Sequence, residues 1–292
     1  MFTLAHLSDP HLPLPPVRWG DLNFKQLTGY GNWLLKRRRV HDPAVLRRIV
    51  GDLKITPVDH IAITGDLSNI AHPDEFRQAR QWLAGIGPDH DITAIPGNHD
   101  AYIPGGVERM RAELEAFMRG DDGGAEFPFV RRRGNIVIVA VNTGVPTLPF
   151  MATGRAGEQQ IGRLASLLSA LEREKMFRVV LIHHPPAGDV SPRKKLIDAD
   201  AFNAVIAERG AELVLHGHNH LQELHWLDGP AGHVPAVGVP SASGAPGRAR
   251  NAAAYNLYRI DSEAGAWRCE METRGIDTDG HVATLKRVML MA

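Results

Sequence analysis

Aspartate, asparagine and histidine residues gather in five short clusters within the first three quarters of the sequence. Each cluster directly follows a short apolar run, and the five are Ser8-Asp9-Pro10-His11, Gly65-Asp66, Gly97-Asn98-His99-Asp100, His183-His184 and His216-Gly217-His218-Asn219-His220. Carboxylate, amide and imidazole groups suit manganese, iron or zinc, and no thiolate is present in the clusters to select a softer metal. These residue types therefore predict a transition-metal site that activates water for hydrolysis.

The spacing within the clusters favours two ions over one. Asp9 and His11 are residues i and i+2 of a chain leaving a strand, so both side chains lie on one side and can reach the same ion. His218 and His220 have the same spacing and could deliver one imidazole to each of two ions. A shared carboxylate such as Asp66 could bridge the ions and hold them ~3.5–4 Å apart, as two-metal hydrolases require.

Short apolar runs rich in β-branched residues predict the strands that carry these clusters. The runs cover residues 3–7, 60–64, 92–95, 135–141, 178–182 and 212–215. N-caps, apolar stripes and terminal glycines predict helices over residues 44–54, 73–83, 107–118, 158–175 and 200–208. Because ligands bind beyond the carboxyl ends of strands in open α/β sheets, we expect the five clusters to converge on one crevice.

The order of the predicted elements indicates the fold class. Strand–helix alternation gives way to a Gly/Pro-rich stretch at 229–250, followed by strands at 254–260 and 266–273. This order favours two packed sheets with outer helices over one parallel, doubly wound sheet. No repeat, low-complexity tract or linker divides the chain, so we predict a single domain over residues 1–292 with an insertion at about 12–50.

The composition narrows the classes of function. Lys+Arg and Asp+Glu both number 33, which gives no overall basic charge to indicate nucleic acid as a partner. The one cysteine, Cys269, fits a reducing compartment. The first residues lack the features of a secretory signal, and no apolar run approaches the ~20 residues that span a bilayer. We therefore expect a cytoplasmic protein.

In order, the five clusters resemble the signature motifs of calcineurin-like metallophosphoesterases. The matching residues are Asp9-x-His11, Gly65-Asp66, Gly97-Asn98-His99-Asp100, His183 and Gly217-His218-x-His220, which span residues 9–220. Each motif is common by itself, but all five in order, each after an apolar strand, are highly specific. Within the family the sequence looks most like the bacterial phosphodiesterase branch, which includes cyclic-nucleotide and glycerophosphodiester enzymes.

The resemblance implies a fold, a cofactor and a role for each matching residue. The fold is an α/β class, four-layer α/β/β/α sandwich of two mixed sheets, and the cofactor is a pair of divalent or trivalent ions of Mn, Fe or Zn. The first metal would be held by Asp9, His11, Asp66 and His220, and the second by Asp66, Asn98, His183 and His218. His183 is preferred to His184 because it comes first after the strand, as in the family.

The resemblance also implies a mechanism. A hydroxide that bridges the two ions would attack phosphorus in line, with Asp66 as the bridging carboxylate. His99 would stabilise or protonate the departing oxygen, and both Asn98 and His99 would contact the substrate. Protein phosphatases of the family carry Gly-Asp-x-x-Asp-Arg-Gly and Gly-Asn-His-Glu, whereas this chain has Asn69 and Asp100 at the corresponding acidic positions. A phosphoprotein substrate is therefore not expected.

Several functions remain open within these limits. The first expectation is hydrolysis of a small nucleotide or glycerol-type phosphodiester. The alternative is a diphosphatase of the UDP-2,3-diacylglucosamine type, acting in lipid A synthesis at the membrane surface. A nuclease is disfavoured by the neutral charge, and a non-catalytic metal-binding scaffold is disfavoured by the complete set of ligands.

Residues 12–40, here called the flap, form the aromatic and basic part of the insertion. Trp33 and Leu34 precede the basic run 36–39, a combination that suits a membrane interface or a lipid-like anionic ligand. The other interpretation is a lid whose aromatic residues pack on the sandwich. Because the flap begins one residue after His11, we expect it to lie beside the metal site. We also expect Trp33 to contact the substrate. A further expectation is that residues 12–40 make peripheral contact with the inner face of the membrane.

The remaining histidines and one arginine run are assigned to ordinary structural roles. His184 and His216 adjoin the site and are candidates for orienting the ligands. The run 131–133 is predicted to be a solvated hairpin edge. The histidines assigned to packing or the surface are His6, His41, His60, His72, His90, His225, His233 and His281.

Overall fold

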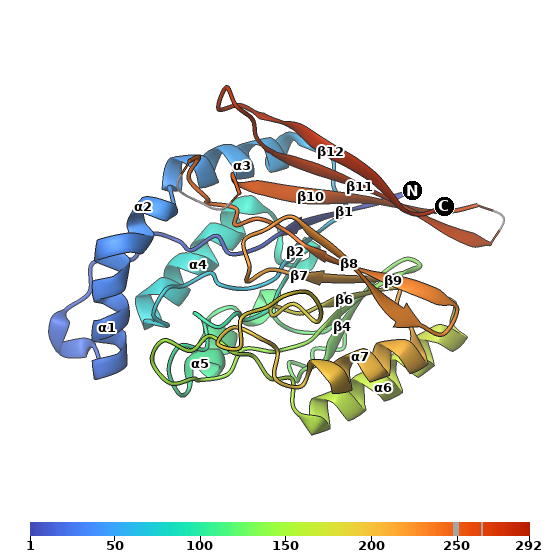
Figure 1. Cartoon of the computed structure of the whole chain (residues 1–292), viewed down its shortest axis with the longest axis horizontal. Helices are drawn as coiled ribbons and strands as arrows, with labels where there is room; N and C mark the ends of the chain where they lie inside the picture. The colour runs from blue at the N-terminus through green and yellow to red at the C-terminus, as the bar shows by residue number, and fades with distance from the viewer. Residues whose placement is uncertain (248–250, 264) are drawn as a thin grey trace.

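Two six-stranded sheets pack face to face in the computed structural model, which describes residues 1–247, 251–263 and 265–292. The first sheet has the order β12-β11-β10-β1-β2-β3 and the second the order β4-β5-β6-β7-β9-β8 (Figure 1). The strands of the first sheet are β1 Phe2–Leu7, β2 His60–Ile63, β3 Ile92–Ala94, β10 Ala254–Glu263, β11 Ala266–Ile276 and β12 Val282–Met291. Those of the second are β4 Phe129–Arg133, β5 Ile136–Ala140, β6 Phe177–Leu181, β7 Leu213–His216, β8 Glu223–Gly229 and β9 Gly232–Gly238.

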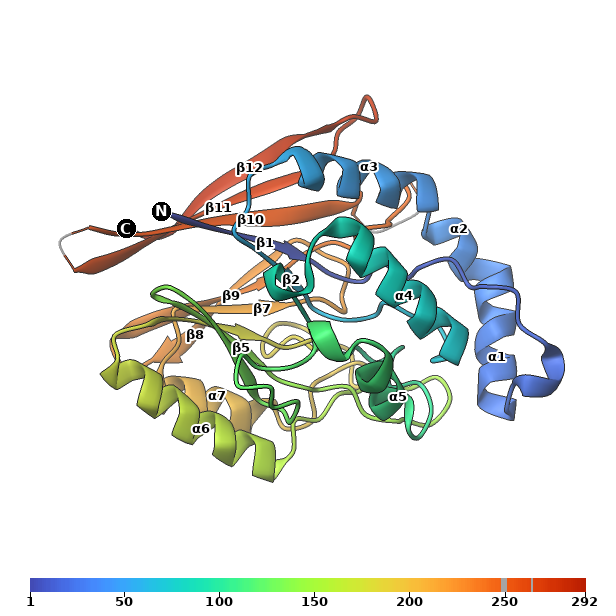
Figure 2. The same ribbon diagram turned by 180° about the vertical axis from the view of Figure 1, so that it is seen from behind.

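Helices cover the outer faces of both sheets, which gives the four-layer α/β/β/α architecture. The α-helices are α1 Phe24–Asn32, α2 Arg38–Val40, α3 Pro43–Ile55, α4 Pro73–Ile86, α5 Gly106–Glu113, α6 Glu158–Arg173 and α7 Ala199–Arg209. A π-helical segment, Trp33–Arg37, joins α1 to α2, and short 3-10 turns occupy Trp19–Asp21, Asp89–Asp91 and Glu115–Phe117. Figures 1 and 2 show α6 and α7 side by side below the second sheet, with α3 and α4 on the opposite side of the molecule.

Side-chain alternation along β5 explains how the second sheet is covered on both faces. Ile136 and Ile138 belong to the core cluster shared with the first sheet, whereas Val137 and Val139 belong to a second cluster with α6 and α7. Successive side chains of a strand point to opposite faces, so an apolar residue at every position is expected of a strand buried on both sides. The two mixed sheets predicted for the chain are therefore observed.

The inner strands run parallel, and this brings their carboxyl ends to the same edge. β1, β2 and β3 are parallel neighbours in the first sheet, and β5, β6, β7 and β9 are parallel neighbours in the second. The outer strands β10, β11, β12, β4 and β8 are antiparallel to their neighbours. The loops after β1, β2, β3, β6 and β7 are those that carry the five polar clusters.

Local capping fixes where two of the covering helices begin. The Asp42 side chain accepts a hydrogen bond from the Ala44 amide, and Pro43 occupies the first turn of α3. His72 caps α4 in a reciprocal arrangement with Glu75, whose carboxylate accepts from the His72 amide. The buried faces of these helices then pack into the core shared with the first sheet.

One sequence prediction was wrong, and the predicted set of strands was incomplete. The hairpin of β8 and β9 and the edge strand β12 lie outside the runs predicted as strands. Residues 248–250 of the Gly/Pro-rich stretch lie outside the described part of the chain. Arg131 is buried, not solvated, and its guanidinium donates to the carbonyls of Arg119, Asp89 and Ala116.

Candidate metal centre

Five loops at the carboxyl ends of the parallel strands form the centre. Main-chain hydrogen bonds tie the loops together: the Asp9 amide donates to the Gly65 carbonyl at 3.0 Å and the His11 amide to the Asp66 carbonyl at 3.1 Å. Gly97 lies so close to Asp66 that a Cβ atom there would collide with the Asp66 carboxylate. The absence of a side chain at Gly97 is therefore what lets this loop approach its neighbour.

Most of the predicted ligands have a left-handed backbone. Their φ angles are 51° for Asp9, 39° for His11, 56° for Asp66, 70° for His218 and 56° for His220. Residues other than glycine rarely adopt this conformation, which costs free energy and clusters at functional sites. The sharp turns allow side chains separated by more than 200 positions to meet, as with Asp9 and His220.

The first group of ligand atoms surrounds one point. His220 Nε2 lies 3.1 Å from Asp9 Oδ1 and 3.4 Å from His11 Nε2, and His11 Nε2 lies 3.7 Å from Asp66 Oδ2. Atoms bound to one ion at ~2.0–2.2 Å are separated by about 3–3.6 Å. The two distances from His220 fall in this range, and that from His11 to Asp66 lies just above it. The four predicted ligands of the first metal are thus brought together.

The second group meets around Asn98 Oδ1. This atom lies 2.8 Å from His218 Nδ1 and 3.2 Å from His183 Nε2, and His183 Nε2 lies 3.6 Å from Asp66 Oδ1. His183 Nδ1 donates to the Thr64 carbonyl at 2.6 Å, which leaves the Nε2 lone pair directed at the group. Asp66 therefore presents Oδ2 to the first group and Oδ1 to the second, so its carboxylate could contribute to both metal sites.

The protonation of the site suits cations. Burial lowers the pKa of His11 and His218 well below the ordinary value, which keeps both imidazoles neutral and able to bind a metal. Burial and the nearby charge of Asp9 raise the pKa of Asp66 well above its ordinary range. Two cations would relieve the repulsion between these carboxylates, so the donor set fits a dinuclear metal centre.

His99 lies at the edge of the centre, and its ring nitrogen Nδ1 is hydrogen-bonded to the main chain. Its Nδ1 is 2.7 Å from the Asn69 carbonyl, and its ring stacks on Tyr102 with 5.9 Å between centroids and 6° between planes. Since a carbonyl only accepts, Nδ1 carries the hydrogen, and the lone pair of Nε2 faces Arg37 Nη1 at 2.6 Å. The Asn69 side chain is turned away and donates to the Leu12 carbonyl, so the main chain of Asn69, not its side chain, supports His99.

Three residues near the centre were not identified from the sequence. Asp100 accepts from the amides of Gly97 and Ser68 and so pins two ligand loops together. The His41 ring lies 4.3 Å from that of His11, although the sequence assigned His41 to packing. Arg37 reaches the centre from the flap, but nothing in the run 36–39 distinguishes it from the other basic residues. For Asp100, its place in the third polar cluster could have indicated a role at the centre.

The two additional histidines of the clusters also border the ligands. His184 Nδ1 lies 2.8 Å from Thr143 Oγ1, and the His184 ring is 4.5 Å from that of His218. His216 is fully buried, and burial lowers its pKa to about 4. Orientation of the ligands by these residues stays a prediction.

A pocket of about 330 Å³ opens beside His99 and is walled by the flap and by the loop 149–152. Trp33 and Arg37 line it from the flap. Lys25 anchors the flap by donating to the carbonyls of Tyr102 at 2.6 Å and Thr147 at 2.5 Å. The pocket lining is Thr28, Gly29, Asn32, Trp33, Lys36, Arg37, Asn69, Asn98, His99, Tyr102, Pro149, Phe150, Met151 and Ala152.

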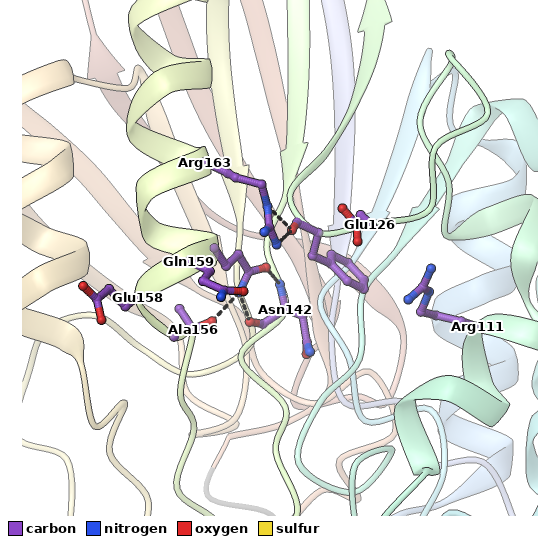
Figure 3. Close-up of a pocket in the computed structure, with 10 residues that line it drawn as sticks. Arg111, Glu126, Asn142, Ala156, Glu158, Gln159 and Arg163 are labelled. Carbon is purple, nitrogen blue, oxygen red and sulfur yellow. Dashed lines mark hydrogen bonds between the residues drawn. The ribbon is translucent and has the colours of Figure 1, made fainter.

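A larger cavity of about 460 Å³ lies elsewhere and contains none of the predicted site residues (Figure 3). Arg163 donates there to the Phe127 carbonyl, and Gln160 donates to the carbonyls of Asn142 and Ala156. These hydrogen bonds fix the start of α6 against the end of β5. Arg163 and Gln160 of this cavity therefore have structural partners, and the predicted site residues lie in the loop cluster instead.

Comparison with known proteins identifies a family and solved structures with a similar fold. A family model described as calcineurin-like phosphoesterase matches residues 2–222. A dimetal phosphatase from Danio rerio superimposes with a TM-score of 0.64 at 12% identity, covering 99% of this chain and 98% of the other. A purple acid phosphatase from yellow lupin seeds superimposes with a TM-score of 0.63 at 13% identity, covering 97% of this chain and 52% of the lupin chain. No curated protein matches.

Among the helices of the described residues, none combines the length and the hydropathy that a membrane span requires.

Proposed function

The chain belongs to the calcineurin-like phosphoesterase family, and on this basis we propose that it hydrolyses a small phosphodiester of the nucleotide or glycerol type. The observation that carries the proposal is the position of Asp66, whose two carboxylate oxygens face two separate groups of ligand atoms. Such a pair of sites is the arrangement with which two-metal hydrolases cleave phosphate esters.

The protein side chains would divide the work of the reaction. Asp9, His11, Asp66 and His220 would hold one ion, and Asp66, Asn98, His183 and His218 the other. Bound Mn, Fe or Zn ions would supply an activated water and neutralise the charge on the phosphate oxygens. His99 Nε2 would face the leaving oxygen once substrate replaces its contact with Arg37, because Nδ1 is bonded to the Asn69 carbonyl.

The pocket beside His99 supports a diester over a monoester. A monoester of a small alcohol leaves little beyond the reacting phosphate, whereas a diester carries a second organic group. The volume of about 330 Å³ is at the lower end of typical small-molecule sites, and Trp33 and Tyr102 give it aromatic walls. Contact of Trp33 with the organic group of the substrate is part of this proposal.

A panel of substrates tests the function on protein loaded separately with Mn, Fe and Zn. We expect kcat/KM for bis-p-nitrophenyl phosphate to exceed that for p-nitrophenyl phosphate by about tenfold or more, with cyclic AMP as a natural diester. Equal values or the reverse order would contradict the diester preference. An Asp66→Ala variant controls for contaminating phosphatases, since it should have no activity on any substrate.

A second candidate is a lipid-linked diphosphatase of the UDP-2,3-diacylglucosamine type that contacts a membrane from the cytoplasmic side. The observation that favours it is the exposure of Phe24, Leu35, Leu148 and Phe150 on the flap and on the loop that faces it. Cleavage of UDP-2,3-diacylglucosamine, together with sedimentation on anionic vesicles, would support this candidate. Digestion of oligonucleotides would instead indicate a nuclease, and two bound metals without any turnover would indicate a scaffold.

A further inference from the structure

Arg37 is the last residue of the π-helical segment Trp33–Arg37, between α1 and α2. Figure 1 shows this part of the chain at one end of the sandwich, where α2 leads into α3. A π-helical turn contains an extra residue and is found frequently at functional sites. Arg37 is half-buried, while its neighbours Lys36, Arg38 and Arg39 are exposed. The basic run therefore directs one of its four members inward.

The Arg37 guanidinium contacts imidazoles and no carboxylate. Its Nη1 lies 2.6 Å from His99 Nε2, and its Nη2 lies 3.2 Å from His11 Nε2. Among the described residues, no ion pair joins Arg37 to an acidic side chain within 4.0 Å, although Asp66 and Asp9 attract it from farther away. A partly buried guanidinium of this kind is matched electrostatically by an oxyanion.

The backbone next to Arg37 is fixed, so the guanidinium is delivered to a defined place. The His41 amide donates to the Arg37 carbonyl at 2.9 Å, and His41 Nδ1 lies 2.9 Å from Ser243 Oγ. The Ala245 amide donates to the Val40 carbonyl at 2.7 Å. The loop that holds this end of the flap also reaches the centre, since the Ser241 hydroxyl donates to the Asp9 carbonyl.

The contact between Arg37 and His11 cannot coexist with a metal on the same nitrogen. His11 Nε2 belongs to the first group of ligand atoms, and an imidazole nitrogen has a single lone pair. When that lone pair binds an ion, the Nη2 donors of Arg37 lose this partner, while Nη1 still faces His99 Nε2. They remain beside His99 and Asn98 in the pocket lining, where the reacting phosphate would lie.

From this geometry we propose that Arg37 is a substrate-binding residue that holds the reacting phosphate through its planar pair of N–H donors. The inference rests on the proposed function and adds to it a residue outside the five motifs. Arginine suits the task because its fork can contact two phosphate oxygens at once, which a lysine ammonium cannot reproduce. The flap thus contributes to phosphate binding as well as to the wall of the pocket.

Binding of inorganic phosphate to the metal-loaded protein, measured by calorimetry, tests the role without turnover. We expect Arg37→Ala to raise the Kd for phosphate by about 10- to 100-fold, the range typical of lost charge-assisted hydrogen bonds, and Arg37→Lys to restore part of it. Arg39→Ala is the matched control, since it removes an exposed charge two residues away, and its Kd should stay within about twofold of the unmodified protein.

Metal analysis and kinetics separate the possible failures. Metal content of Arg37→Ala should equal or exceed that of the unmodified protein, because the competitor for His11 Nε2 has been removed. Loss of metal or of thermal stability in both Arg37→Ala and Arg37→Lys would overturn the proposal in favour of a structural role. If the unmodified protein cleaves bis-p-nitrophenyl phosphate but Arg37→Ala matches Arg39→Ala in phosphate Kd and KM, Arg37 is not a phosphate ligand. If the unmodified protein cleaves no ester, the proposed function itself fails.

Discussion

The metal centre and the flap lie next to each other but are built in different ways. Asp9 and His183 are completely buried, and their loops are held by main-chain hydrogen bonds to neighbouring strands. In the flap, Phe24 and Leu35 are 78% and 73% exposed, and the segment is attached by side chains such as Lys25 and by main-chain bonds at its two ends. The difference suggests a division of labour, with metal binding dependent on the core and substrate choice dependent on the periphery.

Removing the bridging carboxylate is the most severe test of this division. Asp66→Ala deletes the side chain whose two oxygens face the two groups of ligand atoms, so we expect metal content to fall from about two ions per chain to less than one. Activity toward every ester should be lost with it. Elemental analysis and kinetics on the same sample measure both effects. A variant that retained two ions would show that Asp66 does not bridge them.

Changing His99 should affect turnover without affecting the metals. His99→Ala removes the group next to the leaving oxygen, and we expect kcat to fall by roughly 10²–10⁴-fold. Metal content should remain at about two ions, because His99 is absent from both groups of ligand atoms. If His99→Ala lost metal as completely as Asp66→Ala, His99 would have to be counted among the metal ligands, and its assignment as a reaction residue would be wrong.

Truncating the flap side chains should produce a smaller and more selective effect. We expect Trp33→Ala combined with Leu34→Ala to raise KM for the natural diester by about tenfold, or ~1.4 kcal/mol. This is less than the roughly 1.5–3 kcal/mol of one fully buried large apolar side chain, because the flap side chains are only partly covered. The loss on bis-p-nitrophenyl phosphate should be several-fold smaller, and metal content should be unchanged. If KM rose equally for the two substrates, the flap side chains would not select between substrates, and the proposed difference in role between the flap and the metal centre would be wrong.

The smallest expected effect concerns stability in acid. Burial lowers the pKa of His6 to about 3, whereas an unfolded histidine titrates near 6.5. As pH falls below about 6.5 the unfolded chain gains a proton that the folded chain does not, so the free energy of unfolding should decrease down to about pH 3. His6→Gln should flatten this slope of Tm against pH. The exposed His233→Gln should leave the slope unchanged, and a similar slope in all three proteins would contradict the assignment.

The core and the ligand loops were predictable because their signals are local. The β-branched runs gave strands such as β2 and β6 to within one or two residues, and the polar clusters follow them directly. Arg37 and His41 were not predictable in this way. Their approach to the centre depends on long-range contacts, such as the bond from His41 to Ser243, that leave no periodic pattern in the sequence. Arg131 was misassigned because carbonyl groups, which have no sequence signature, bind its guanidinium.

The left-handed backbone of the ligands also constrains how this chain could evolve. Asp9, His11, Asp66, His218 and His220 each hold a conformation that costs a residue other than glycine ~1 kcal/mol or more. A duplicated copy released from catalysis could therefore become more stable by accepting glycine or asparagine at these positions. Drift toward such residues in a descendant would record the loss of the metals. Retention of all five strained residues, by contrast, is a cost that only continued metal binding would offset.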